Sequence, residues 1–312
     1  MNNNQSIRVF APATVANVAC GFDVLGFAIE QPGDEVILRP NKERRVIIKQ
    51  ITGDGGKLSL DPTQNTAGVS ILKMLEALSS KQGFDIELHK KIGLGSGLGS
   101  SASSSVAAAY AVNILLGNPF KTIELLPFTM EAERIACGSA HADNVAPSLM
   151  GGFVLIRSYD PLDVVRIPHP EGLHCSVIHP SIELRTEDSR KALPQMIELK
   201  KAVKQWGNIG GLISGLFMND FSLIGKSLED IIAEPYRAKL IPGFYEMKNV
   251  AMEASALGCS ISGSGPSVFA LCKDEKTAIE SGRKMKEIMD QMGIASNVYT
   301  SPINHSGPQI RE

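Results

Sequence analysis

The segment Gly93–Ser105 contains four alternating glycines followed by small hydroxyl residues, a composition that could bind phosphate. Glycine has no Cβ, so its backbone can approach a ligand closely. Residues Val106–Leu116 are predicted to form a helix, and a helix N-terminus directs free N–H groups and the positive end of its dipole at one point. A packed turn between a helix and a sheet explains the same residues equally well, because glycine-rich runs alone are weakly specific.

The familiar phosphate-binding patterns fit this segment poorly. A P-loop needs a lysine directly after its last glycine, and no lysine stands there. A dinucleotide fingerprint that begins at Gly95 and Gly97 would need a third glycine where Ser100 stands. The His-Arg-Asp and Asp-Phe-Gly motifs of protein kinases are absent from the sequence. The residues therefore indicate another kind of nucleotide loop, or none.

A second candidate cluster lies near the start of the chain, where Asn17 and Asp23 are surrounded by small and apolar residues. A buried carboxylate is costly unless it is paired, so Asp23 needs a cationic partner. Both residues could instead cap turns, a common role for Asn and Asp.

A third cluster consists of Glu133, His141, Asp143 and Asn144, which lie close together in the sequence. Such residues could hold a hard cation and polar substrate groups, and Mg²⁺ bound through a single carboxylate fits them better than a transition metal. Surface polarity near a helix end is the alternative. The small and apolar residues between them favour a functional site.

The order of predicted elements indicates two domains in an α+β protein. The region between Arg157 and Leu173 is polar and rich in proline, which is typical of a boundary. After it, the predicted order is β-α-β-β-α-β with extra helices, the arrangement of a ferredoxin-like domain. We therefore predict domains at residues 1–168 and 169–312. A glycine-rich segment, Ser262–Ser267, separates the two central strands as a tight hairpin, a substrate-facing loop, or both.

Composition excludes several classes of protein. The chain has 312 residues and a net charge of −2, and its basic residues form no long block that would suggest a nucleic-acid partner. It has no apolar run long enough to span a membrane, and its first residues, Met1–Gln5, lack the pattern of a signal peptide and are predicted to be a disordered tip. The five cysteines have no metal-like spacing, which indicates reduced structural thiols in a cytoplasmic protein.

Three segments, taken in order, resemble the motifs of one known family. Pro12–Asp23, Gly95–Ala102 and Ser262–Pro266 are similar to the three motifs of the GHMP small-molecule kinases. Three further segments resemble the homoserine kinase branch of that family: His141–Pro147, Thr186–Pro194 and Glu234–Pro242. The resemblance extends from about Val9 to Tyr299, nearly the whole chain. Each glycine motif is weakly specific by itself, but the ordered set is strongly specific.

The resemblance implies a fold and a nucleotide. The first half would be the GHMP kinase N-terminal nucleotide-binding domain with a left-handed βαβ unit, and the second half the C-terminal ferredoxin-like domain. ATP would lie over the glycine loop, and Ser101 and Glu133 would bind Mg²⁺. Gly93 stands where the family usually has proline, a departure that leaves the loop amides in place. The implied ATP-binding residues are Gly95, Ser96, Gly97, Leu98, Gly99, Ser100 and Ser101.

The resemblance also implies the substrate L-homoserine. Its carboxylate would bind Arg190 and Arg237, because a guanidinium can donate two parallel hydrogen bonds, and its ammonium would bind Asp23. Asn17, His141 and Gly263 match further substrate-binding positions. Asn144 matches a position near the transferred phosphoryl group, which makes it and His141 the catalytic candidates.

The implied reaction is in-line transfer of the ATP γ-phosphoryl group to the side-chain hydroxyl of homoserine, a step of threonine biosynthesis. Its products are O-phospho-L-homoserine and ADP, and no general base is assigned. The resemblance further implies a possible homodimer. Two alternatives remain: a GHMP kinase that acts on a sugar or an isoprenoid alcohol, and a non-catalytic ligand sensor with the same fold. The first would not need the two arginines in its pocket, and the second would bind ATP without turnover.

Overall fold

The computed structural model describes residues 6–138 and 140–312 of the chain. The predicted disordered tip therefore lies outside the described residues, as does the thiol of Cys137. Two separate sheets organise the structure, one of seven strands and one of four. None of the described helices is both long and apolar enough to cross a membrane.

The first sheet contains seven strands in the order β11-β1-β2-β4-β3, with β5 added to β2 and β6 added to β5. Its strands are β1 (Ile7–Ala16), β2 (Leu25–Asn41), β3 (Val46–Thr52), β4 (Gly83–His89), β5 (Phe153–Tyr159), β6 (Leu162–Ile167) and β11 (Gln309–Arg311). The pairing of β3 with β4 is parallel, and the chain runs between them through helix α1, so these elements form a βαβ unit.

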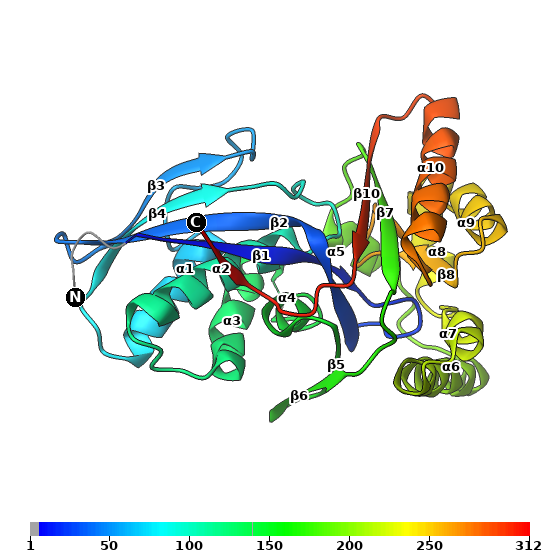
Figure 1. Cartoon of the computed structure of the whole chain (residues 1–312), viewed down its shortest axis with the longest axis horizontal. Coiled ribbons are helices and arrows are strands. Elements are labelled where there is room, and N and C mark those ends of the chain that lie inside the picture. The colour runs from blue at the N-terminus through cyan, green and yellow to red at the C-terminus, as the bar shows by residue number, and fades with distance from the viewer. Residues whose placement is uncertain (1–5, 139) are drawn as a thin grey trace.

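Helices gather on one side of the first sheet, as Figure 1 shows. They are α1 (Thr66–Ala77), α2 (Ser100–Leu115), the 3₁₀ turn η1 (Thr122–Leu125), α3 (Leu126–Cys137) and α4 (Val145–Met150). Asn65 caps α1 as predicted, because its side chain accepts a hydrogen bond from the Ala67 N–H. The alanines of α2 are fully buried, which confirms the predicted close packing of this helix against the sheet.

Helix α2 begins at Ser100, earlier than the predicted start at Val106. The intervening serines are poor helix formers in isolation, because their hydroxyls compete for backbone hydrogen bonds. Here the hydroxyls have tertiary partners. The Ser103 Oγ donates to the carbonyl of Ala11 at 2.7 Å, and the Ser104 Oγ donates to the Asp34 carboxylate at 2.9 Å. Burial in these contacts, rather than local propensity, places the helix start directly at the glycine loop.

The second sheet is antiparallel throughout, with the strand order β10-β7-β9-β8. Its strands are β7 (His174–Pro180), β8 (Gly258–Ile261), β9 (Val268–Cys272) and β10 (Ser296–Pro302). The helices of this half are α5 (Thr186–Lys191), α6 (Leu199–Met218), α7 (Phe221–Ser227), α8 (Glu234–Arg237), the 3₁₀ turn η2 (Ala238–Leu240), α9 (Phe244–Glu253) and α10 (Glu275–Gln291). This order confirms the predicted ferredoxin-like arrangement.

The end of the chain returns to the first sheet. Ile303 forms a bridge with Ile29, and β11 pairs with β1, so the final strand belongs with the N-terminal elements. The range 169–312, predicted as the second domain, therefore contains a strand of the first sheet. Four cysteines are described, Cys20, Cys175, Cys259 and Cys272, and all four are buried free thiols that form no disulfide.

Candidate active site

The three sequence motifs meet at one place between the two sheets. The Ser262 hydroxyl donates a 2.7 Å hydrogen bond to the carbonyl of Gly97, which joins the hairpin loop to the glycine loop. The Gly263 N–H donates to the Ala16 carbonyl at 3.1 Å, and the Thr14 N–H donates to the Leu98 carbonyl at 3.1 Å. Segments distant in the sequence thus form a single framework around a pocket of about 490 Å³.

The glycine loop needs its glycines for conformation and for space. Gly97 and Gly99 have φ values of 75° and 64°, in the left-handed region that side chains rarely adopt. A Cβ on Gly97 would lie 2.5 Å from the Ser262 carbonyl oxygen, and one on Gly99 would lie 2.1 Å from the Thr14 hydroxyl. Gly99 precedes α2 without a side-chain cap, so first-turn N–H groups of this long helix can bind an anion.

A buried ion pair contacts the end of the glycine loop, where α2 begins. The Lys90 ammonium pairs with the Asp34 carboxylate and also donates to the Ser100 carbonyl and the Ser104 hydroxyl, each at 2.7 Å. Burial lowers the pKa of Lys90, while the neighbouring Asp34 favours its charged form. The sequence analysis did not identify this pair. Its only local signal was a lysine at the end of a predicted strand, directly before the loop.

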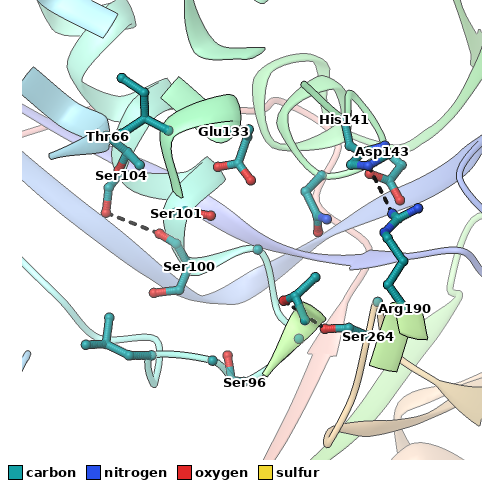
Figure 2. A pocket seen from close by; sticks show the side chains of 18 of the residues that line it. Thr66, Ser96, Ser100, Ser101, Ser104, Glu133, His141, Asp143, Arg190 and Ser264 are labelled. Atoms are coloured by element: carbon teal, nitrogen blue, oxygen red, sulfur yellow. Dashed lines mark hydrogen bonds between the residues drawn. The ribbon is translucent and has the colours of Figure 1, made fainter. Parts of the chain in front are cut away.

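Ser101 and Glu133 form the part of the pocket that suits a divalent cation. Figure 2 shows the two side chains near each other, Ser101 on α2 and Glu133 on α3. Both line the pocket, and Glu133 is only 5% exposed. A hydroxyl and one carboxylate are hard oxygen donors, and Mg²⁺ typically binds few protein ligands beside water and substrate phosphates. The donor set therefore fits Mg²⁺ next to a nucleotide.

Arg190, Asp23 and His141 form a charged cluster at the other end of the pocket, as Figure 2 shows for Arg190 and His141. The Arg190 guanidinium donates to both oxygens of Asp23, at 3.1 and 3.2 Å, and also to the His141 Nε2 at 2.9 Å. The cationic partner that Asp23 was predicted to need is thus a residue of this chain. Burial lowers the pKa of His141. Because arginine can only donate, the His141 Nε2 accepts this bond and the ring proton lies on Nδ1.

Arg237 is held next to this cluster by backbone carbonyls. Its Nη1 donates to the Gly263 carbonyl at 3.0 Å and its Nε donates to the Ser189 carbonyl at 3.3 Å. The Asn17 amide donates to the same Gly263 carbonyl at 2.8 Å and accepts from the Asp23 N–H at 2.9 Å. The guanidinium carbon of Arg237 lies 5.1 Å from the centre of the Phe22 ring, within cation–π distance. Arg237 is only 3% exposed, so its position is well defined.

Asn144 lies between the two ends of the pocket. Its side-chain oxygen accepts a 2.7 Å hydrogen bond from the Thr14 hydroxyl, which leaves its amide N–H₂ group for a ligand. Of all the residues predicted for the site, only Leu98 does not line the pocket, because its side chain is packed in the core. Several pocket residues were not predicted from the sequence: Leu58, Gln64, Asn65, Thr66, Lys90, Leu94, Ser104, Ile135, Thr186 and Ser264.

Asp143 gives the folded protein a stability that depends on pH. Burial, followed by the charges of Asp23 and Glu133, raises the pKa of Asp143 from 3.8 to about 7. Between these values the folded state binds more protons than the unfolded state, so the free energy of unfolding should fall as the pH rises. Asp143→Asn is neutral at every pH, and we expect it to exceed the native chain in stability at pH 8 by roughly 2–4 kcal/mol, but not at pH 4.

Urea unfolding at pH 4, 6 and 8 measures this effect. The control is Asp163→Asn, which removes a surface carboxylate paired with Arg157 and should change stability by less than about 1 kcal/mol. Equal stability curves for Asp143→Asn and the native chain across this pH range would contradict the prediction.

Comparisons with known proteins show which family this chain belongs to. The model of the GHMP kinases N terminal domain matches residues 65–152, and the model of the GHMP kinases C terminal matches residues 199–291. A homoserine kinase of Chlorobium phaeovibrioides (strain DSM 265 / 1930) is 52% identical over 98% of this chain and 99% of its own length. The chain belongs to the homoserine kinase family of the GHMP kinases.

Solved structures agree with this membership of the homoserine kinase family. The crystal structure of homoserine kinase from Cytophaga hutchinsonii ATCC 33406 has a TM-score of 0.97 and 57% identity, and the match covers 100% of this chain and 99% of that one. A mevalonate kinase from L. major in complex with R-mevalonate has a TM-score of 0.72 at 15% identity, covering 94% of this chain and 95% of that one. The second likeness shows a shared fold only. The two-domain GHMP kinase fold predicted from the sequence is confirmed.

Proposed function

We propose that this protein is an ATP-dependent kinase that phosphorylates the side-chain hydroxyl of L-homoserine, giving O-phospho-L-homoserine and ADP. The observation that carries this proposal is the charged end of the pocket, where two arginines and an aspartate lie together beside a phosphate-binding loop. The relatives of similar length are homoserine kinases, which supports the same substrate. A sugar or an isoprenoid alcohol gives no reason for this arrangement of charges.

The charged end is the electrostatic complement of an amino acid. Homoserine carries a carboxylate and an ammonium on one carbon, and its hydroxyl lies at the other end of a short chain. In the proposed complex the carboxylate binds Arg190 and Arg237, and the ammonium binds Asp23. The Arg190–Asp23 ion pair keeps both groups in place before binding, so less ordering of side chains is needed when the substrate arrives.

The remaining pocket residues orient the phosphoryl donor. In the proposed complex the ATP phosphates bind the amides of the Gly95–Ser101 loop and the N-terminus of α2, which favour negative charge. The Asn144 amide donates to the transferred group or to the attacking hydroxyl. Ser101 and Glu133 would hold Mg²⁺, which when bound neutralises charge on the phosphates. Positioning and charge neutralisation account for most of the catalysis in such transfers.

A dedicated general base is not assigned. The Nε2 of His141 already accepts a hydrogen bond from Arg190, so this nitrogen is not free to take the hydroxyl proton. Asp23 accepts from the same guanidinium. In the proposed mechanism His141 therefore orients Arg190, and the hydroxyl proton passes to the phosphoryl oxygens as the new bond forms.

The proposed reaction is tested by ADP release from ATP and Mg²⁺ with L-homoserine, compared with mevalonate, galactose and L-serine. We expect turnover with L-homoserine and at most a small fraction of that rate with the other three. Turnover with a different alcohol would discard the proposed substrate and retain the nucleotide site. ATP binding without turnover on any of the four would replace the kinase proposal by the ligand-sensor reading.

Arg237→Lys tests the carboxylate site. A lysine keeps the charge but cannot donate two parallel hydrogen bonds, so we expect the KM for L-homoserine to rise about 10- to 100-fold. The KM for ATP should stay within about twofold, because Arg237 belongs to the charged end of the pocket. The matched control is Lys239→Arg, which changes a cation two residues further along. An unchanged KM for L-homoserine in Arg237→Lys would remove this residue from the substrate site.

Two predictions from the sequence, the domain boundary and the homodimer, remain proposals. We place the boundary between the domains near residue 168, where the chain leaves β6 and enters the second sheet. We also propose the homodimer that the resemblance implied.

A further inference from the structure

Two buried side chains outside the pocket, Gln205 and Asp230, connect the segments that build its charged end. Gln205 belongs to α6 and is 4% exposed, and Asp230 lies between α7 and α8 and is 8% exposed. Neither residue lines the pocket. A buried amide and a buried carboxylate are costly unless they are hydrogen-bonded, so their partners show which parts of the chain they hold in place.

The Gln205 side chain uses both ends of its amide. Its Nε2 donates to the Cys20 carbonyl at 2.9 Å and to the Asp230 Oδ1 at 3.0 Å, and its Oε1 accepts from the Ile231 N–H at 3.1 Å. Two acceptors at one end and a donor at the other fix the orientation of this amide. Gln205 therefore joins the loop that leads to Asp23 to the segment that leads into α8.

The Asp230 carboxylate holds the start of α8. Its Oδ1 accepts from the N–H groups of Ile232 and Ala233 at 2.8 and 3.0 Å, and its Oδ2 accepts from the Glu234 N–H at 2.9 Å. The first N–H groups of a helix have no partner within it, so a single carboxylate fixes this turn. Arg237 is the last residue of the same short helix, and its backbone position therefore depends on Asp230.

The loop before Asp23 needs support from outside, because its backbone is strained. Val18 and Ala19 have φ values of 40° and 57°, in the left-handed region, which is a rare conformation for a β-branched residue such as valine. Such residues persist only where the surrounding structure holds them. The hydrogen bond from Gln205 to the Cys20 carbonyl is one contact that does so.

We propose that Gln205 and Asp230 are positioning residues that set the separation of Asp23 and Arg237. The inference rests on the proposed function, in which the substrate ammonium binds Asp23 and its carboxylate binds Arg237. These two groups of an α-amino acid are joined to one carbon, so their binding sites must keep a fixed separation. The amide and carboxylate provide a connection between the two sites that the substrate does not touch.

A second connection between the same segments lies on the pocket side. The Gly263 carbonyl accepts hydrogen bonds from both Asn17 and Arg237. Loss of the outer connection through Gln205 should therefore displace the binding groups without abolishing the site. We expect a graded loss of substrate affinity in a folded and active protein.

Gln205→Met tests the connection, because it keeps the length of the side chain and removes its hydrogen bonds. The Cys20 carbonyl and the Ile231 N–H lose their partner, so both segments can shift. We expect the KM for L-homoserine to rise about tenfold, since small displacements of binding groups have large effects, and the KM for ATP to stay within about twofold. A residue that only stabilises the fold would reduce the amount of active protein and leave both KM values unchanged, an outcome that would overturn the proposal.

The matched control is Asn208→Leu on the same helix. The Asn208 side chain donates to the Glu229 carbonyl at 2.9 Å, so it contacts the segment next to Asp230 without the buried link to Cys20. Both KM values should stay within about twofold in this variant. The same rise in the KM for L-homoserine in Asn208→Leu and Gln205→Met would mean that any disturbance of α6 has this effect, and the positioning role would be wrong.

Asp230→Ala is compared with Asp274→Ala, because both aspartates hold the start of a helix. The Asp274 side chain caps α10 by accepting from the Thr277 N–H at 2.7 Å. Both variants should unfold at a lower urea concentration than the native chain. Only Asp230→Ala should also raise the KM for L-homoserine, by about tenfold. An unchanged KM in Asp230→Ala would reduce Asp230 to a helix cap.

Hydrogen exchange of the substrate-free chain separates this inference from the proposed function. The Asp23 N–H, which donates to the Asn17 side chain, and the backbone N–H groups of α8 report on the two segments. Both should exchange faster in Gln205→Met and neither in Asn208→Leu. Absence of L-homoserine turnover by the native chain would contradict the proposed function alone. Unchanged exchange in Gln205→Met would contradict the positioning role, whatever the substrate.

Discussion

Glu133→Gln should reduce kcat about 10²- to 10³-fold, a loss of about 3–4 kcal/mol of transition-state stabilisation. Glu133 and Ser101 both line the pocket beside the glycine loop, and Figure 2 shows their side chains near each other. The amide keeps the size of the side chain and removes its charge. The Mg²⁺ concentration needed for half-maximal turnover should rise in parallel, because the amide is a weaker ligand for a hard cation.

The control for this result is Glu131→Gln on the same helix. Glu131 pairs with Arg134 at 2.6 Å on the surface, so its loss should change neither kcat nor the Mg²⁺ requirement. Calorimetry of ADP binding with and without Mg²⁺ provides a readout that does not depend on turnover. Full activity of Glu133→Gln at limiting Mg²⁺ would exclude this carboxylate from the cation site.

Lys90→Met should destabilise the protein by about 3–5 kcal/mol, because it leaves the Asp34 carboxylate buried without its ammonium partner. The side chains of Lys90 and Asp34 are 1% and 0% exposed, so neither water nor salt can replace the lost interaction. The same substitution removes the hydrogen bond to the Ser100 carbonyl at the start of α2. We therefore also expect a higher KM for ATP. Urea unfolding and steady-state kinetics measure the two effects.

The neighbouring residue provides the control. Lys91 pairs with Glu35, but its side chain is 54% exposed, and Lys91→Met should cost at most about 1 kcal/mol. A double variant, Lys90→Met with Asp34→Asn, removes both charges and should recover much of the stability while the KM for ATP stays high. Recovery of both quantities together would mean that the pair stabilises the fold without positioning the loop.

Local chemistry in the sequence determined the glycine loop and the order of elements. Gly97 and Gly99 have left-handed φ values that glycine adopts readily, so the run of glycines indicated a tight loop before the fold was known. The alternation of strands and helices in the second half likewise follows from the pattern of apolar residues along the chain. These features indicated the α+β class, the ferredoxin-like arrangement and the position of the glycine loop, whereas the nucleotide at that loop was implied only by the family resemblance.

The tertiary structure alone decided which charges meet. Asp23 and Arg190 are 167 positions apart in the sequence. The residues indicated only that Asp23 needed a cation, and the family resemblance assigned that role to the substrate ammonium and not to Arg190. Lys90 and Asp34 are 56 positions apart, and neither the lysine nor the aspartate gives a local sign of a buried pair. The α2 start at Ser100 and the pairing of β11 with β1 also depend on distant contacts. Backbone preferences act within a few residues, whereas ion pairs and burial are fixed only when packing brings remote segments together.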